Sequence, residues 1–211
     1  MKEYPHIDTI WARDMTNKGR IVEGAFTAPE FAYLAENRWI GTEKVDGTNV
    51  RVMWDGFTLR FGGKTNNAQM STFLLARLQD LFSPMAMLDK FGNADSGPQV
   101  CLYGEGFGAT IQKGGGNYIS DGVDFTLFDV KVGGWWLKRE TIEEIATYFR
   151  IVPVPVVFTG TLAAACRMVR QGFNSQWGEF AAEGLVLKPA VDLLRRNGER
   201  LITKIKTVDY Q

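Results

Sequence analysis

Histidine and cysteine are almost absent from this chain of 211 residues, which holds only His6, Cys101 and Cys166. Structural and catalytic zinc sites draw mainly on these two residue types, so the sequence offers no plausible zinc site. It also offers no histidine paired with a serine or cysteine nucleophile. Both cysteines lie in apolar segments, where we expect buried, reduced thiols.

Long apolar runs and an excess of one charge are also lacking. No segment approaches the roughly 18 apolar residues of a membrane span, and the charged N-terminus has no apolar signal region. The 24 basic and 24 acidic residues balance, so no global field marks a nucleic-acid binder. We expect a soluble, cytoplasmic protein with no membrane partner, and one domain over residues 1–211.

The periodicity of the chain predicts an α+β fold. Strand-like segments come in clusters separated by glycine turns, which favours mainly antiparallel sheets with flanking helices and a nucleotide held between sheets. A capping box at 27–30 predicts a helix through 37, and Asp55-Gly56 predicts a two-residue hairpin turn. The other predicted helices are 71–90 with a break at Pro84, 139–149 and 161–171. The predicted strands are 50–54, 57–61, 99–105, 124–132, 184–188 and 201–206.

A lysine stands between a predicted buried strand and a glycine turn in the segment Glu43-Lys44-Val45-Asp46-Gly47-Thr48-Asn49. A lysine nucleophile reacts as the neutral amine, and an unperturbed pKa of roughly 10.4 leaves about one molecule in a thousand neutral near pH 7. Positive neighbours or desolvation must therefore assist it. The short motif also recurs by chance, and the alternative is an exposed lysine before a turn.

Two glutamates and three lysines could assist such a nucleophile. Glu105 and Glu183 stand beside glycines at strand ends, where a carboxylate can reach a ribose hydroxyl or a magnesium ion. Lys204 and Lys206 share one face of a predicted strand, and Lys188 adds a third cation. Clustered lysines attract phosphate and favour the neutral form of a neighbouring amine. The alternatives are solvated carboxylates and an edge strand protected by lysine.

Five short motifs follow one another between residues 44 and 206. They are Lys-Val-Asp-Gly at 44–47, Tyr-Gly-Glu-Gly at 103–106, Phe-Thr-Leu-Phe-Asp at 125–129, Glu-Gly-Leu-Val-Leu-Lys at 183–188 and Lys-Ile-Lys at 204–206. The series resembles motifs I, III, IIIa, IV and V of the covalent nucleotidyltransferases. With the Thr48-Asn49 extension and the return strand that carries Arg60, it is most similar to the RNA ligase 2-like family of ATP-dependent RNA ligases.

The resemblance implies a nucleotidyltransferase core of the ATP-grasp-like ligase type and phage-like RNA-repair chemistry. Lys44 would attack the α-phosphate of ATP with Mg²⁺ or Mn²⁺ present, forming lysyl-AMP. The AMP would pass to the 5′-phosphate of an RNA end or nicked duplex, and a 3′-hydroxyl would displace it to seal the strand.

The resemblance also implies roles for individual residues. Glu105 would contact the ribose and serve as a second metal candidate, Phe128 would stack on adenine, and Glu183 would hold the metal. Phe125 competes for the stacking role but should face the other side of its strand. Lys204 and Lys206 would bind the α-phosphate, and Asn49 and Arg60 would serve the nucleic-acid steps. The remaining nucleotide-binding candidates are Glu43, Val45, Arg60 and Lys188.

Three other functions remain open from the sequence: a DNA nick-sealing ligase, a GTP-dependent capping guanylyltransferase and a non-catalytic nucleic-acid-binding relative. One feature departs from the resemblance. Ligases of this kind commonly continue into a second domain, whereas this chain ends at Gln211, five residues after Lys206. We therefore expect no separate C-terminal nucleic-acid-binding domain, and either a minimal catalytic core or a partner protein that replaces the missing surface.

Overall fold

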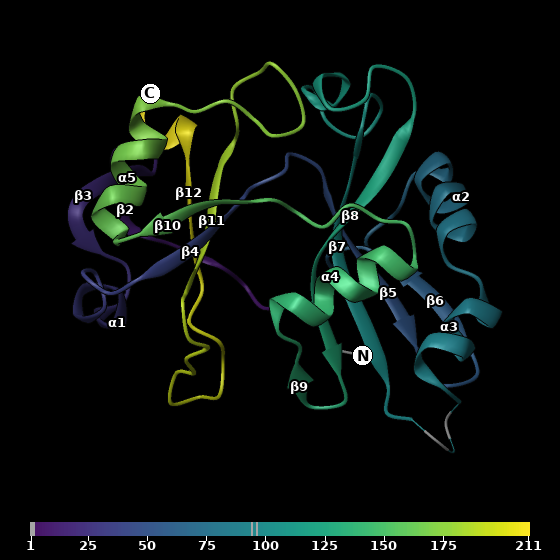
Figure 1. Ribbon diagram of the computed structural model, residues 1–211. Helices are drawn as coiled ribbons and strands as arrows, with labels where there is room; N and C mark the ends of the chain where they lie inside the picture. The colour runs from purple at the N-terminus through teal and green to yellow at the C-terminus, as the bar shows by residue number, and fades with distance from the viewer. Residues whose placement is uncertain (1–2, 94, 96) are drawn as a thin grey trace. The chain divides into compact units, whose positions relative to one another are not determined.

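The chain divides into two compact units (Figure 1). The computed structural model describes residues 3–93, 95 and 97–211. Unit 1 holds the N-terminal residues through Tyr4 together with Asp46–Val154, and unit 2 holds Pro5–Val45 and Pro155–Gln211. The lysine motif spans the boundary, because Lys44 belongs to unit 2 and Asp46 to unit 1. The expectation of a single adenylation domain stays a prediction.

Unit 1 is built on a five-stranded antiparallel sheet in the order β6-β5-β7-β8-β9. Its strands are β5 (Thr48–Trp54), β6 (Leu59–Gly62), β7 (Val100–Gly108), β8 (Val123–Val132) and β9 (Trp135–Trp136). Its helices are α2 (Thr72–Leu81), α3 (Pro84–Phe91), α4 (Arg139–Tyr148) and the 3-10 helix η1 (Gly115–Asn117). Antiparallel neighbours joined by short turns are what the clustered strand pattern predicts.

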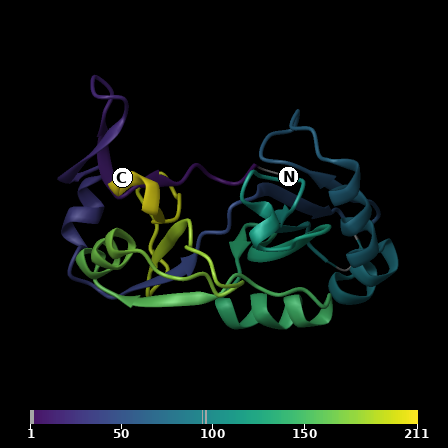
Figure 2. The ribbon, with the colours of Figure 1, turned by 90° about the horizontal axis from the view of Figure 1, so that it is seen from above.

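One face of this sheet carries the core of unit 1. Val50 and Val52 of β5 pack with Leu74 and Leu78 of α2 and with Ile145 of α4, all within one buried cluster. Figure 2 shows α4 along one side of the sheet. Successive side chains of a strand point to opposite faces of its sheet. The side chains that alternate with these valines therefore lie on the face opposite the helices, where they can make other contacts.

Unit 2 contains a second five-stranded sheet, in the order β1-β12-β11-β4-β10. Only the β1–β12 pairing is parallel among the described strands of this sheet. Its strands are β1 (Asp8–Thr9), β4 (Trp39–Glu43), β10 (Val156–Gly160), β11 (Gly184–Pro189) and β12 (Thr203–Lys206), and β2 (Trp11–Asp14) with β3 (Arg20–Phe26) forms a separate hairpin. Its helices are α1 (Pro29–Tyr33), α5 (Leu162–Gln171) and the 3-10 helix η2 (Thr207–Tyr210). Helix α5 packs through Ala165 and Val169 against Leu185 and Ile205 of the sheet.

Most predicted elements are present, and the mixed α+β class with mainly antiparallel sheets is confirmed. The predicted break at Pro84 separates α2 from α3. The capping box is wrong: α1 begins after Ala28 without a side-chain cap and ends at Tyr33. The predicted two-residue turn is also wrong, because Trp54 pairs with Leu59 and leaves a four-residue connection.

Both cysteines are buried, as predicted, and burial raises the pKa of the Cys101 and Cys166 thiols. The thiolate is the reactive form, so native protein at pH 8 should react slowly with a thiol reagent such as DTNB. Rapid reaction of two thiols is expected only after unfolding in urea. Fast labelling of the folded protein would contradict the buried placement.

In the part of the chain that the structure describes, no helix is long and apolar enough to cross a membrane.

Candidate active site

Lys44 follows directly on β4, a strand whose residues alternate between buried and half-buried positions. Trp39 at the start of β4 lies in the core of unit 2 and fixes the strand. At the other end, the Lys44 backbone N–H donates to the carbonyl of Gly184 at 2.9 Å. Lys44 is thus held just beyond the end of β4, beside the start of β11.

Glu183, the residue before β11, joins two lysines. The Lys44 Nζ donates to Glu183 Oε2 at 2.6 Å, and the Lys206 Nζ lies 2.7 Å from Glu183 Oε1. The side chains are 21%, 18% and 34% exposed for Lys44, Glu183 and Lys206, so water reaches each of them in part. The predicted nucleophile, one predicted phosphate-binding lysine and the predicted metal ligand therefore form one cluster in unit 2.

The remaining predicted lysines lie on the same sheet as this cluster. In β12, Thr203 and Ile205 are buried while Lys204 and Lys206 are half-buried, which confirms that the two lysines share a face. Lys204 pairs with Val186 of β11, and Lys188 lies two residues further along that strand. Their side chains lie on the face opposite the core residues Leu185 and Leu187.

The structure gives the carboxyl group of Glu43 an internal role. Glu43 is 1% exposed, accepts a hydrogen bond from Ser175 Oγ at 2.5 Å, and accepts another from the Gln176 backbone N–H at 2.8 Å. These bonds tie the end of β4, one residue before Lys44, to the segment that follows α5. The sequence predicted Glu43 as a nucleotide contact and gave no signal for Ser175. Val45, the other predicted neighbour of Lys44, is buried at 4% exposure.

Replacing Ser175 by alanine should destabilise the protein by about 1–3 kcal/mol, since a buried carboxyl group loses a hydrogen-bond donor. The free energy of unfolding in urea measures this change. Ser120→Ala is the matched control, because Ser120 is exposed and its loss should change stability by less than about 0.5 kcal/mol. Equal effects of the two substitutions would contradict the role given to Ser175.

In unit 1, the Asp46-Gly47 turn packs tightly against β7. A β-carbon at Gly47 would overlap the carbonyl oxygen of Gly106 and lie 2.8 Å from Cγ of Glu105, so this position requires glycine. The Asp46 backbone N–H donates to the Tyr118 hydroxyl at 3.1 Å, and the Gln112 side chain donates to the Gly47 carbonyl at 3.0 Å. Glu105 therefore lies directly beside the second half of the lysine motif.

Two further predicted residues lie on the face of the unit 1 sheet that the helices leave uncovered. Asn49 pairs in register with Glu105, which places these side chains beside each other on one face. Phe128 is half-buried, whereas Phe125 is 2% exposed and lies in the core. The aromatic ring that remains accessible is thus the predicted one.

Arg60 lies elsewhere on this sheet. It pairs with Met53, four residues along β5 from Asn49 and so about 13 Å away along the strand. Its guanidinium contacts the Asp55 carboxylate at 3.0 Å, at the hairpin end. The structure does not bring Arg60 beside Asn49, and the predicted roles of Arg60 stay predictions.

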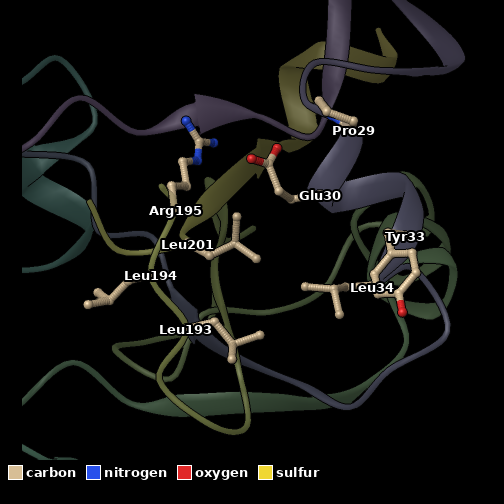
Figure 3. Close-up of a pocket in the computed structure, with 8 residues that line it drawn as sticks. All are labelled: Pro29, Glu30, Tyr33, Leu34, Leu193, Leu194, Arg195 and Leu201. Carbon is tan, nitrogen blue, oxygen red and sulfur yellow. The ribbon is translucent and has the colours of Figure 1, made fainter. Parts of the chain in front are cut away.

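An apolar hollow of about 460 Å³ in unit 2 lies apart from these residues (Figure 3). The residues that line it are Pro29, Glu30, Tyr33, Leu34, Leu193, Leu194, Arg195 and Leu201. The Arg195 guanidinium donates to Asp8 at 3.1 Å. The lining includes none of the predicted nucleotide-binding residues, so this hollow is not the candidate active site.

Known structures share the fold of this chain. RNA ligase of Naegleria gruberi, as a lysine mutant with ATP and Mn, matches with a TM-score of 0.67 and 17% identity over 100% of this chain and 58% of that one. A second lysine mutant of that enzyme, with AMP and Mn, gives 0.66 and 16% over 100% and 59%. The same enzyme with pyrophosphate gives 0.65 and 18% over 100% and 59%.

The chain thus spans less than two thirds of the solved structures that it matches. A comparison with curated protein sequences finds no match. The RNA ligase family model matches residues 37–206, a range that includes both Lys44 and Lys206. This match covers most of the sequence and every motif that suggested a nucleotidyltransferase, and the chain belongs to the RNA ligase family.

Proposed function

We propose that this chain is the adenylyltransferase part of an ATP-dependent RNA ligase. The observation that carries the proposal is the cluster of Lys44, Glu183 and Lys206, within a range that the RNA ligase family model matches. In the first step the neutral Lys44 amine attacks the α-phosphate of ATP. A nitrogen–phosphorus bond forms, the bond to the β-phosphate oxygen breaks, the amine loses a proton, and pyrophosphate leaves.

Two further transfers complete the joining reaction. An oxygen of an RNA 5′-phosphate attacks the lysine-bound phosphorus, and the nitrogen takes up a proton as the nitrogen–phosphorus bond breaks, which frees Lys44 as its amine. A 3′-hydroxyl then attacks the RNA phosphate, loses its proton, and displaces AMP. The RNA ligases of Naegleria gruberi with ATP or AMP and Mn support this choice of nucleotide and metal.

Glu183 holds Lys44 in a contact that must break before the first step. Its carboxylate accepts a hydrogen bond from the Lys44 Nζ, so the lysine must leave this contact and give up a proton before it attacks. Lys206 lies against the other carboxylate oxygen. Its positive charge attracts the phosphate and stabilises the negative charge that develops on it.

The carboxylates present are suited to a divalent cation that takes most of its ligands from the nucleotide and water. Among the described residues no group of three or more histidine, cysteine, aspartate or glutamate side chains could hold a metal ion. Magnesium commonly takes only one or two carboxylates together with substrate phosphates and water. Glu183 is the residue we assign to it, with Glu105 as the second candidate. When bound, the ion would neutralise charge on the triphosphate.

Unit 1 supplies the groups that we assign to the nucleoside. The Asp46-Gly47 turn packs beside Glu105, which supports a ribose contact for that carboxylate. Phe128 offers a half-buried ring for adenine, and Lys204 and Lys188 add charge for the phosphates. Asn49, beside Glu105, is assigned to the steps on RNA.

The experiment is a joining assay with four labelled substrates: a nicked RNA duplex, a nicked DNA duplex, single-stranded RNA and pre-adenylated RNA. ATP or GTP is supplied with Mg²⁺ or Mn²⁺. We expect ATP-dependent joining of RNA and ATP-independent joining of pre-adenylated RNA. Joining of DNA alone would favour the DNA ligase alternative, labelling of the protein by GTP alone would favour a guanylyltransferase, and no reaction at all would favour a non-catalytic relative. If only pre-adenylated RNA is joined, a partner protein or further chain supplies the first step.

A further inference from the structure

Tyr4 is the centre of an aromatic cluster on the face of the unit 1 sheet opposite its helices. Its ring centroid lies 5.1 Å from that of Tyr103, 5.1 Å from that of Phe128 and 5.8 Å from that of Trp136. The contact with Phe128 has an interplanar angle of 76°, an edge-to-face arrangement that aromatic rings favour. The Tyr4 hydroxyl donates to Asp129 Oδ2 at 2.5 Å.

A β-bulge explains how Tyr4 can touch two consecutive residues of β8. Tyr103 pairs with Asp129 and Gly104 pairs with Leu127, so Phe128 is the extra residue between these pairs. In a regular strand Phe128 and Asp129 would point to opposite faces. At a bulge a side chain is re-aimed and the local ladder is interrupted. Phe128 therefore depends on tertiary contacts to hold the direction of its ring.

We propose that Tyr4 is a positioning residue for nucleotide binding, because it fixes the ring of Phe128 in the plane on which the base stacks. This inference rests on the proposed function. The hydrogen bond to Asp129, which is 1% exposed, holds the Tyr4 side chain in place. The edge-to-face contact with Tyr4 in turn restricts the orientation of the Phe128 ring. Without Tyr4, the half-buried ring of Phe128 would have to be ordered each time the nucleotide binds, and the cost of ordering it would weaken binding.

Tyr4→Leu removes both the ring contact and the hydroxyl, and Tyr4→Phe removes only the hydroxyl. We expect Tyr4→Leu to raise the KM for ATP in lysine adenylation about three- to tenfold, with kcat changed less than twofold. Tyr4→Phe should give a smaller rise. Tyr148→Leu is the matched control, since Tyr148 is another tyrosine of unit 1 that donates to an aspartate, Asp89, at 2.6 Å.

A second measurement follows base stacking directly. The fluorescence of 2-aminopurine riboside triphosphate falls when its base stacks on an aromatic ring. We expect quenching on binding to wild-type protein and to Tyr148→Leu, weaker quenching with Tyr4→Leu, and little quenching with Phe128→Ala. Circular dichroism checks that each variant is folded, and Tyr4→Phe keeps the test available if Tyr4→Leu does not fold.

The outcomes separate this inference from the proposed function. If wild-type protein neither binds the fluorescent nucleotide nor forms an AMP adduct, the proposed function fails and the inference fails with it. If wild-type protein does both and the Tyr4 variants match it in KM and quenching, only the role of Tyr4 is overturned. A lower KM for ATP in Tyr4→Leu would also overturn that role, because it would mean that Tyr4 hinders the base from reaching the ring of Phe128.

Discussion

Lys44→Ala is expected to abolish joining of RNA that carries a 5′-phosphate while joining of pre-adenylated RNA continues. Alanine has no amine to attack ATP, so the loss should be at least about a thousandfold, as when other enzymes lose a nucleophile. Pre-adenylated RNA already carries the activated phosphate and bypasses this step. The two rates, measured with labelled RNA, locate the role of Lys44 in the first transfer.

Lys90→Ala is the matched control for this substitution. Lys90 lies at the end of α3, with its Nζ 5.2 Å above the Tyr148 ring, and is not among the predicted site residues. Its replacement should leave both joining rates within about twofold of wild type, since surface substitutions rarely disturb the fold. Retained joining of 5′-phosphate RNA by Lys44→Ala would contradict the assignment of the nucleophile.

Lys206→Met is expected to lower the kcat of lysine adenylation by about 10²–10³-fold, the usual cost of removing one group aimed at a developing negative charge. Such a group acts mainly in the transition state, so the KM for ATP should change less than kcat. Methionine retains much of the side-chain volume, which limits the loss of packing. Steady-state adenylation at several ATP concentrations separates the two constants.

Arg13→Met provides the comparison for Lys206→Met. Arg13 forms an ion pair with Asp209 at 2.5 Å in the same unit, so its removal also breaks a contact between a cation and a carboxylate. The expected adenylation rate of Arg13→Met is close to that of wild type. A kcat for Lys206→Met within twofold of wild type would contradict a role for its charge in the reaction.

The pattern of polar and apolar residues within short segments predicted correctly those helices and strands whose packing follows that pattern. The α5 helix begins at the N-cap Thr161, whose side chain accepts from Ala164, and the alternation in β12 places both lysines on one face. The prediction failed where side chains compete for backbone groups. The α1 helix stops early as the Trp39 indole N–H takes the carbonyl of Leu34 at 2.8 Å. The Asp55 side chain accepts the backbone N–H groups of Phe57 and Thr58, which makes the hairpin connection longer than two residues.

The proximity of three residues in the candidate site was predictable from short motifs. Lys44, Glu183 and Lys206 were all predicted as site residues from sequence, and the structure brings them together. Ser175 and Tyr4 were missed because their partners are 132 and 125 residues away, and nothing in the neighbouring sequence marks such pairs. The placement of Arg60 depended on the length of the hairpin connection, which the sequence did not define.

Intact-protein mass spectrometry tests directly whether Lys44 forms lysyl-AMP. Wild-type protein is incubated with ATP and Mn²⁺ or Mg²⁺, and the product is digested to locate the modification. We expect a protein heavier by one AMP, with the added group on the peptide that contains Lys44. The absence of an adduct, or AMP attached to another residue, would contradict the assignment of Lys44 as the nucleophile.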